Sequence, residues 1–160
     1  QLGVIILLIT GGTTSVALQM LSGDKANQAK IFRLNFAVNI MIALVFSSIL
    51  ALFANEAMSL YGPKYTQYSN LIYIVCLIAI FATINSIYNK LLISNNDLRI
   101  ILYHTIVVSV ICISFATFSN ISDFSMLLAL TFLLYYFCFF LLDSIYILRR
   151  YKKYFLEAAR

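Results

Sequence analysis

Residues Ile100–Ser122 read IILYHTIVVSVICISFATFSNIS, a run of 23 residues without a charged side chain. An α-helix rises about 1.5 Å per residue, so about 20 apolar residues cross a hydrocarbon layer of about 30 Å. Four more runs lack charge over a similar length: Gln1–Gly23, Leu34–Asn55, Tyr65–Asn89 and Phe124–Leu142. Backbone polar groups in lipid must be paired within their own segment, which favours helices. The sequence therefore predicts an all-α, polytopic membrane protein with five transmembrane helices.

The composition also indicates lipid rather than water as the solvent. Of 160 residues, 62% are hydrophobic and 11% are charged, whereas a soluble domain of this size needs far more charged surface. The net charge of +5 does not predict nucleic-acid binding, because the basic residues gather at the ends of apolar segments. Three cysteines deep inside apolar runs and a single histidine predict neither a disulfide framework nor a metal site.

The expected helices cover residues 2–21, 31–54, 68–93, 98–118 and 124–148, joined by short polar connectors. Gly62 and Pro63 break any helix between the second and third, and Asn95-Asn96 suits a helix C-terminus. Ser122 and Asp123 are both candidate caps for the last helix. Ten of the eleven lysines and arginines then fall on one side of the membrane. The positive-inside rule places that side, and the C-terminus, in the cytoplasm.

The start of the chain also carries information. The sequence begins with Gln1 inside an apolar run that no basic segment precedes. A signal peptide has a basic segment before its apolar run and a small-residue cleavage site after it. We therefore expect a fragment that lacks an N-terminal part.

The first expected helix carries polar side chains around the Gly11-Gly12 pair: Thr10, Thr13, Thr14 and Gln19. Two adjacent glycines permit a bend, which predicts a helix whose hydroxyls line a cavity. Close helix packing through small residues accounts for the same pattern. Both interpretations stay open, because they concern different faces of one helix.

Two further helices each carry a pair of asparagines four residues apart, and each pair shares one helix face. Asn35 and Asn39 follow Arg33 in the second helix, while Asn85 and Asn89 precede Lys90 in the third. A substrate cavity lined by these six side chains is one hypothesis. Hydrogen bonding between helices, with the basic residues at the membrane surface, is the plainer alternative.

His104 and Asp143 are the ion-coupling candidates of the expected helices. His104 lies about one turn into the fourth helix and has a side chain that titrates near neutral pH. Asp143 is an acidic residue inside a membrane segment, which by default suggests function. The alternative interpretation is a hydrogen-bonded structural histidine, with Asp143 reaching the interface to pair with a basic neighbour such as Arg149 or Arg150.

No motif in the sequence predicts an enzyme. The chain has no phosphate loop, no HExxH, no paired carboxylates and no Ser-His-Asp arrangement in a plausible setting. The loops are short and lack the acidic, histidine or arginine clusters that membrane-embedded transferases and phosphatases carry. We therefore expect a protein that is not an enzyme.

Five short motifs together resemble one family of bacterial membrane proteins. They are LSGDK at 21–25, KIFR at 30–33, LFANE at 52–56, LYGPKY at 60–65 and NKLLISNND at 89–97. With them the chain resembles the C-terminal lobe of the bacterial polysaccharide (O-antigen) flippases, in the multidrug/oligosaccharidyl-lipid/polysaccharide exporter superfamily. The LYG-x-x-Y outer loop after the LFA helix end is the most specific element. Asn96-Asp97 stands where the family often has Gly-Lys.

The resemblance implies a two-lobed exporter of about twelve helices, of which these residues match roughly the eighth to the twelfth. It implies flipping of an undecaprenyl-diphosphate-linked oligosaccharide across the bacterial cytoplasmic membrane, for surface polysaccharide such as the O-antigen of lipopolysaccharide. The implied partners are the lipid-linked oligosaccharide, the missing N-terminal lobe and polysaccharide polymerase machinery. Helix 2–21 is expected to line the cavity between the lobes. No cofactor is implied, and the family has no fixed catalytic motif.

Two alternatives stay open beside the flippase. An ion-coupled drug or metabolite antiporter of the same superfamily predicts an acidic residue facing the central cavity, and Asp143 is its candidate. A membrane subunit without transport activity predicts five helices that are complete in themselves and a defined partner.

Overall fold

The computed structural model describes residues 28–151, and all regular structure in this part of the chain is helical. Its long helices are α2 (Gln28–Leu52), α4 (Ser69–Ser94), α5 (Leu98–Phe118) and α6 (Phe124–Arg150). Four helical segments are long and apolar enough to cross a membrane. The helix expected over 2–21 and the basic tail after Tyr151 lie outside the described residues.

Helix bounds follow the charge-free runs closely. The helix expected over 98–118 has those bounds as α5, and α4 and α6 differ from expectation by one or two residues at an end. The second helix begins at Gln28 rather than at residue 31 and ends at Leu52 rather than at residue 54. At the start of α6, the Asp123 side chain accepts hydrogen bonds from the backbone amides of Ser125 and Met126, which confirms it as the cap.

The connector between α2 and α4 is more ordered than the sequence predicts. It contains α3 (Ala54–Ser59) and a 3₁₀ helix, η1 (Pro63–Tyr68). Gly62 has φ of 118°, which only glycine adopts readily, and it separates the two short helices as expected. The helical turns provide hydrogen-bond partners for backbone groups that an irregular loop next to lipid would leave unpaired.

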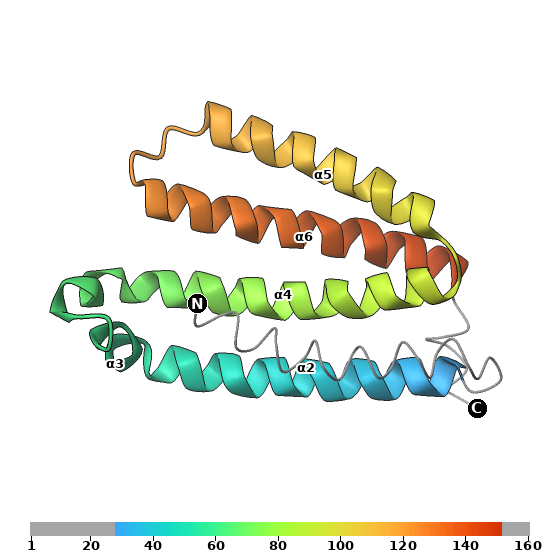
Figure 1. The fold of residues 1–160 in the computed structure, drawn as a ribbon, viewed down its shortest axis with the longest axis horizontal. Coiled ribbons are helices and arrows are strands. Elements are labelled where there is room, and N and C mark those ends of the chain that lie inside the picture. The colour runs from blue at the N-terminus through green and yellow to red at the C-terminus, as the bar shows by residue number, and fades with distance from the viewer. Residues whose placement is uncertain (1–27, 152–160) are drawn as a thin grey trace.

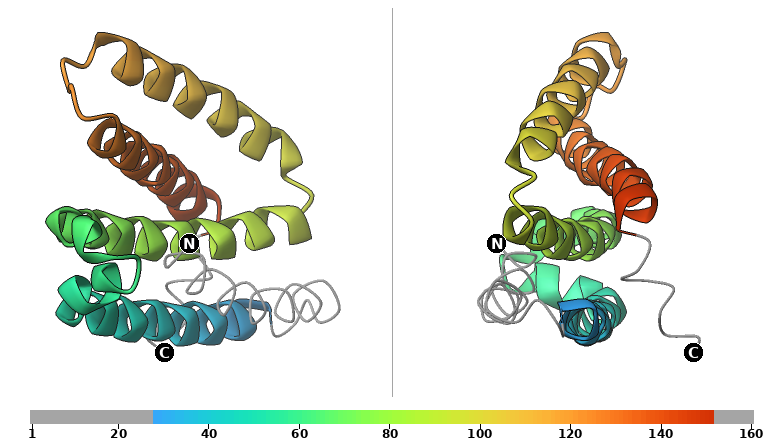
Figure 2. Two further views of the ribbon diagram at one scale, coloured as in Figure 1. Left: turned by 60° about the vertical axis from the view of Figure 1, so that its left-hand side comes forward. Right: turned by 90° about the vertical axis from the view of Figure 1, so that its right-hand side faces the viewer.

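The helices form a row in the order α2, α4, α6 and α5 (Figure 1). Helices α4 and α6 run in the same direction, and α2 and α5 run opposite to them (Figure 1). We call the end of the row at the α4–α5 turn the Asp97 end, and the end at η1 the Pro63 end. Helices α5 and α6 splay apart in the view of Figure 2.

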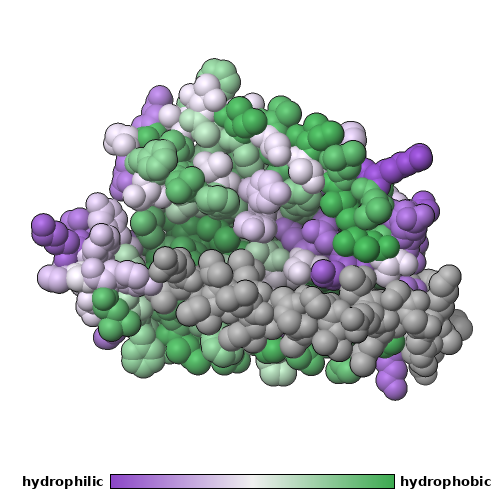
Figure 3. Space-filling model, in the orientation of Figure 1, coloured by the Kyte–Doolittle hydropathy of each residue, from purple (hydrophilic) through white to green (hydrophobic). Residues whose placement is uncertain are grey.

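The main core lies at the Asp97 end, where α2, α4 and α6 meet. It contains seven buried side chains: Phe32, Ile87, Tyr88, Leu91, Leu92, Ile147 and Tyr151. Elsewhere the helices expose large apolar side chains to their surroundings, and Figure 3 shows these over much of one face. Exposed apolar surface along whole helices is what a hydrocarbon solvent favours.

Candidate functional site

A polar cleft lies along one side of α4, and we call it the α4 cleft. It has a volume of about 450 Å³ and is lined by Ala82, Asn85, Ser86, Asn89, Lys90, Ile93 and Tyr136. Six of these residues come from α4, where spacings of three and four bring them to adjacent positions on the helix. Tyr136 comes from α6 and closes the cleft from the neighbouring helix.

Two amide side chains line the α4 cleft. The Asn85 side chain is buried and donates from Nδ2 to the carbonyl oxygen of Tyr136 at 2.8 Å. The Oδ1 atoms of Asn85 and Asn89 are buried and have no hydrogen-bond partner among the described residues. A buried acceptor without a partner costs about 1–3 kcal/mol. A ligand that donates hydrogen bonds, such as a hydroxyl-rich one, would satisfy these two oxygens if a change of packing exposed them to the cleft.

Lys90 adds a positive charge to the same cleft. No ion pair joins Lys90 to another described residue. An ammonium group beside amide acceptors offers attraction to an anionic group next to hydrogen bonding for hydroxyls. The sequence-predicted residues Asn85, Asn89 and Lys90 thus lie together.

The asparagines of α2 lie elsewhere. Asn39 is fully buried and donates to the backbone oxygen of Asn35 at 2.8 Å and to its Oδ1 at 2.7 Å. Both share the buried stripe of α2 with Ala43 and Ser47, which contact α4. These two asparagines, like Arg33, do not line the α4 cleft. Thr10, Thr13, Thr14 and Gln19 lie outside the described residues.

His104 of α5 and Asp143 of α6 meet inside the helix row. The Nδ1 atom of His104 lies 2.6 Å from Oδ1 of Asp143. Both side chains are buried, Asp143 completely. The interpretation that Asp143 reaches the interface and pairs with a basic neighbour is therefore wrong, because its partner is His104. Asp143 itself lies about 10 Å along α6 from Arg150.

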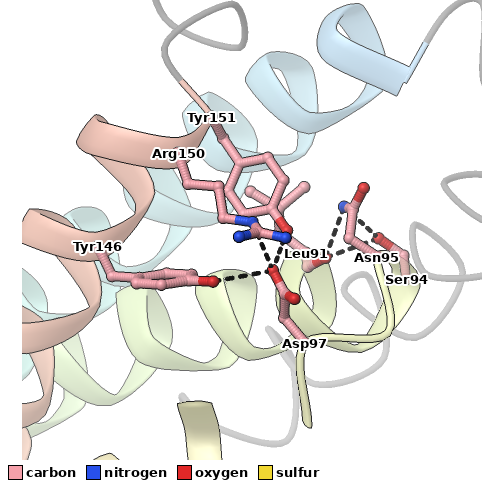
Figure 4. Close-up of polar contacts among 7 residues, drawn as sticks. All are labelled: Leu91, Ser94, Asn95, Asp97, Tyr146, Arg150 and Tyr151. Carbon is pink, nitrogen blue, oxygen red and sulfur yellow. Dashed lines mark hydrogen bonds and ion pairs between the residues drawn. The ribbon is translucent and has the colours of Figure 1, made fainter. Parts of the chain in front are cut away.

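A third polar cluster surrounds Asp97, and nothing in the sequence pattern predicted it. Oδ2 of Asp97 accepts hydrogen bonds from the Tyr146 hydroxyl at 3.1 Å and from the Tyr151 hydroxyl. The Arg150 Nε lies 3.3 Å from the same oxygen (Figure 4). We call this group the Asp97 clamp, because it fastens the α4–α5 turn to the end of α6.

The Asp97 clamp alters the electrostatic surroundings of Tyr151. Burial, and then the neighbouring Asp97 carboxylate, raise the pKa of the Tyr151 phenol well above its ordinary value. The available signal was a tyrosine at the end of the last expected helix and an aspartate in the turn between the third and fourth expected helices. Interfacial tyrosines are common in membrane proteins, however, and this hides the specific contact from sequence reasoning.

The described residues contain no group of three side chains able to hold a metal ion. Comparisons of the chain with family models, with curated proteins and with solved structures find no match.

Proposed function

We propose that this chain is part of a transporter that flips an undecaprenyl-diphosphate-linked oligosaccharide across the bacterial cytoplasmic membrane, for surface polysaccharide synthesis. The observation that carries the proposal is the α4 cleft, a polar recess on a helix long and apolar enough to span lipid. The motifs that resemble the flippase family support the same class. In this proposal the Asp97 end and the C-terminus face the cytoplasm, as the distribution of basic residues predicts.

The chemistry of the cleft suits such a substrate. A glycan and its diphosphate cannot enter hydrocarbon without losing hydrogen bonds to water, which costs several kcal/mol per unsatisfied group. When the transport cycle exposes them, the unpartnered amide oxygens of Asn85 and Asn89 replace water as acceptors for sugar hydroxyls. Lys90 attracts the negative charge of the headgroup.

The proposal places the cleft in a larger cavity. An N-terminal lobe on the same polypeptide is expected to supply the opposite wall, as in two-lobed exporters that work by alternating access. The Gly11-Gly12 pair in the sequence expected to form the first helix, which lies outside the described residues, suits the moving part of such a wall.

Surface glycan in cells tests the function. Deleting the full-length gene should remove surface polysaccharide, and the parent gene should restore it. A variant with Asn89→Leu and Lys90→Gln should restore little, because it removes one open acceptor and the charge of the cleft. Lys64→Gln is the matched control, since Lys64 is an exposed lysine at the Pro63 end. Unchanged surface glycan in the deletion strain would refute flipping.

An ion-coupled antiporter is the second candidate, and the buried pair of His104 and Asp143 favours it specifically. Efflux of a cationic drug from proteoliposomes, driven by an imposed ion gradient, separates it from the flippase. Gradient-dependent drug efflux together with normal surface glycan in the deletion strain would favour the antiporter.

A further inference from the structure

The contact between α5 and α6 rests on few side chains. Three residues of α5 are buried, at intervals of four: His104, Val108 and Cys112. Val108 and Cys112 pack against Phe139 in an apolar cluster. The polar contacts of this seam are the His104–Asp143 pair and a weak one from the Cys112 thiol to the Thr131 carbonyl oxygen at 3.8 Å. His104 and Asp143 therefore form the strongest polar link between the two helices.

The surroundings of the pair contain hydroxyl groups rather than other charges. From α4, Tyr88 is the titratable group near Asp143, and its hydroxyl lies 3.5 Å from Ser144 Oγ. The rings of Tyr103 and Tyr146 lie 6.2 and 6.3 Å from the His104 ring. Among the described residues no lysine, arginine or glutamate forms an ion pair with either member.

The two oxygens of the Asp143 carboxyl group differ in their hydrogen bonding. Oδ2 of Asp143 is buried and has no hydrogen-bond partner among the described residues. A carboxylate with one unpartnered oxygen in a dry site is costly, and protonation of the pair lowers that cost. The geometry thus favours a site that binds and releases a proton.

The number of protons bound to the His104–Asp143 pair depends on whether α5 and α6 are packed together. A neutral imidazole that donates from Nδ1 to the carboxylate leaves the buried pair with a charge of −1. One further proton makes the pair neutral, as imidazolium with carboxylate or as imidazole with carboxylic acid, and burial without a cationic neighbour among the described residues favours this neutral state. Free in water, an aspartate and a histidine titrate at about 3.9 and 6.5, so near pH 8 they lack this further proton. Packing α5 onto α6 then takes up one proton from water, and separating them returns it.

We propose that His104 and Asp143 form a proton-binding site whose occupancy is linked to the packing of α5 on α6. No covalent bond between heavy atoms changes: one proton joins the pair when the seam closes and leaves to water when it opens. The site operates independently of the substrate identity proposed above, and it gives the protein a means of coupling to a proton gradient.

The native cysteines provide an internal test. Cys112 lies in the α5–α6 seam and Cys76 in the α2–α4 contact, and they are matched in exposure at 7% and 6%. Alkylation of both thiols by N-ethylmaleimide, measured by mass spectrometry on the purified full-length protein in lipid, compares the two seams. The ratio of the Cys112 rate to the Cys76 rate cancels most of the general effect of pH on thiol reactivity.

In the parent protein this ratio should rise from pH 7 to pH 9, approaching about tenfold per pH unit, because opening releases one proton. Asp143→Asn should leave the ratio flat in the same range, and Glu56→Gln, which removes an exposed acid, should behave like the parent. A flat ratio in the parent, or an equal rise in Asp143→Asn, overturns the proposal.

A second measurement covers the case in which Asp143→Asn fails to fold. The chain has one histidine, and a His104→Gln sample identifies its signals in spectra of ¹⁵N-histidine-labelled protein. The ring nitrogens of His104 should keep their chemical shifts from pH 7 to pH 9 in the parent protein, because the closed pair holds its proton over this range. Ring signals that follow the titration of a free imidazole between pH 5 and pH 9 overturn the proposal. Neither readout depends on glycan transport, so this inference and the proposed function fail separately.

Discussion

The α2–α4 contact and the α5–α6 contact differ in the side chains that form them. The α2–α4 contact brings together small buried residues, Ala43 and Ala79, with Ser47 donating to the Cys76 carbonyl oxygen. The α5–α6 contact contains a buried pair of ionisable side chains, His104 and Asp143. Shape holds the first contact, and it should not respond to pH. The second contact adds a buried ionisable pair to the apolar cluster of Val108, Cys112 and Phe139, so the two contacts should respond differently to a change of pH.

The largest expected effect breaks the buried pair. His104→Leu leaves Asp143 buried without its partner and should lower the free energy of unfolding by about 3–5 kcal/mol. The double variant His104→Leu with Asp143→Leu should recover most of this loss, because no uncompensated polar group remains. Unfolding of the purified protein in detergent micelles measures both. A double variant as unstable as the single one contradicts the pairing.

A smaller effect is expected when the shape-based contact is overfilled. Ala79→Leu inserts a bulkier side chain where Ala79 is 1% exposed and should cost about 1–3 kcal/mol. Ala37→Leu, at an exposed position of α2, is the control and should change stability little. The cost of Ala79→Leu should be the same at pH 6 and pH 8. A cost that depends on pH would show that the stability of the α2–α4 contact also depends on pH, which contradicts the comparison.

The smallest effect concerns the Asp97 clamp, which lies beyond both contacts. Tyr151→Phe removes one hydrogen bond to a carboxylate and should cost about 1 kcal/mol below pH 10. The pKa of Tyr151 is raised in the folded protein, so its contribution is complete below the unfolded value of about 10 and declines as pH rises above it. Unfolding curves from pH 8 to pH 11 should therefore converge for parent and variant. Curves that stay parallel contradict the clamp.

The helices could be located from the sequence because the solvent sets their length. A charge-free run such as Ile100–Ser122 is typical of a membrane helix, and the ends of α5 follow from it directly. The contact of His104 with Asp143 could not be predicted in this way. Membrane helices are apolar on all sides, so the amphipathic pattern that orients a soluble helix is missing. Without that pattern, two residues 39 positions apart give no sign that they meet.

The candidate site, too, could be predicted from the sequence only in part. The spacing of Asn85 and Asn89 predicted a shared face, because it depends only on the geometry of one helix. Tyr136 was not predicted as their neighbour, since its place depends on how α6 packs against α4. The helical order of α3 was also missed, because its sequence is typical of a polar connector.

The central claim is that α4 and its neighbours cross a lipid bilayer. Topology reporters fused after Pro63 and after Asn96, on the two sides of α4, test it most directly. We expect the two fusions to report opposite compartments, with the Asn96 fusion in the cytoplasm. Both fusions reporting the same compartment would contradict the claim.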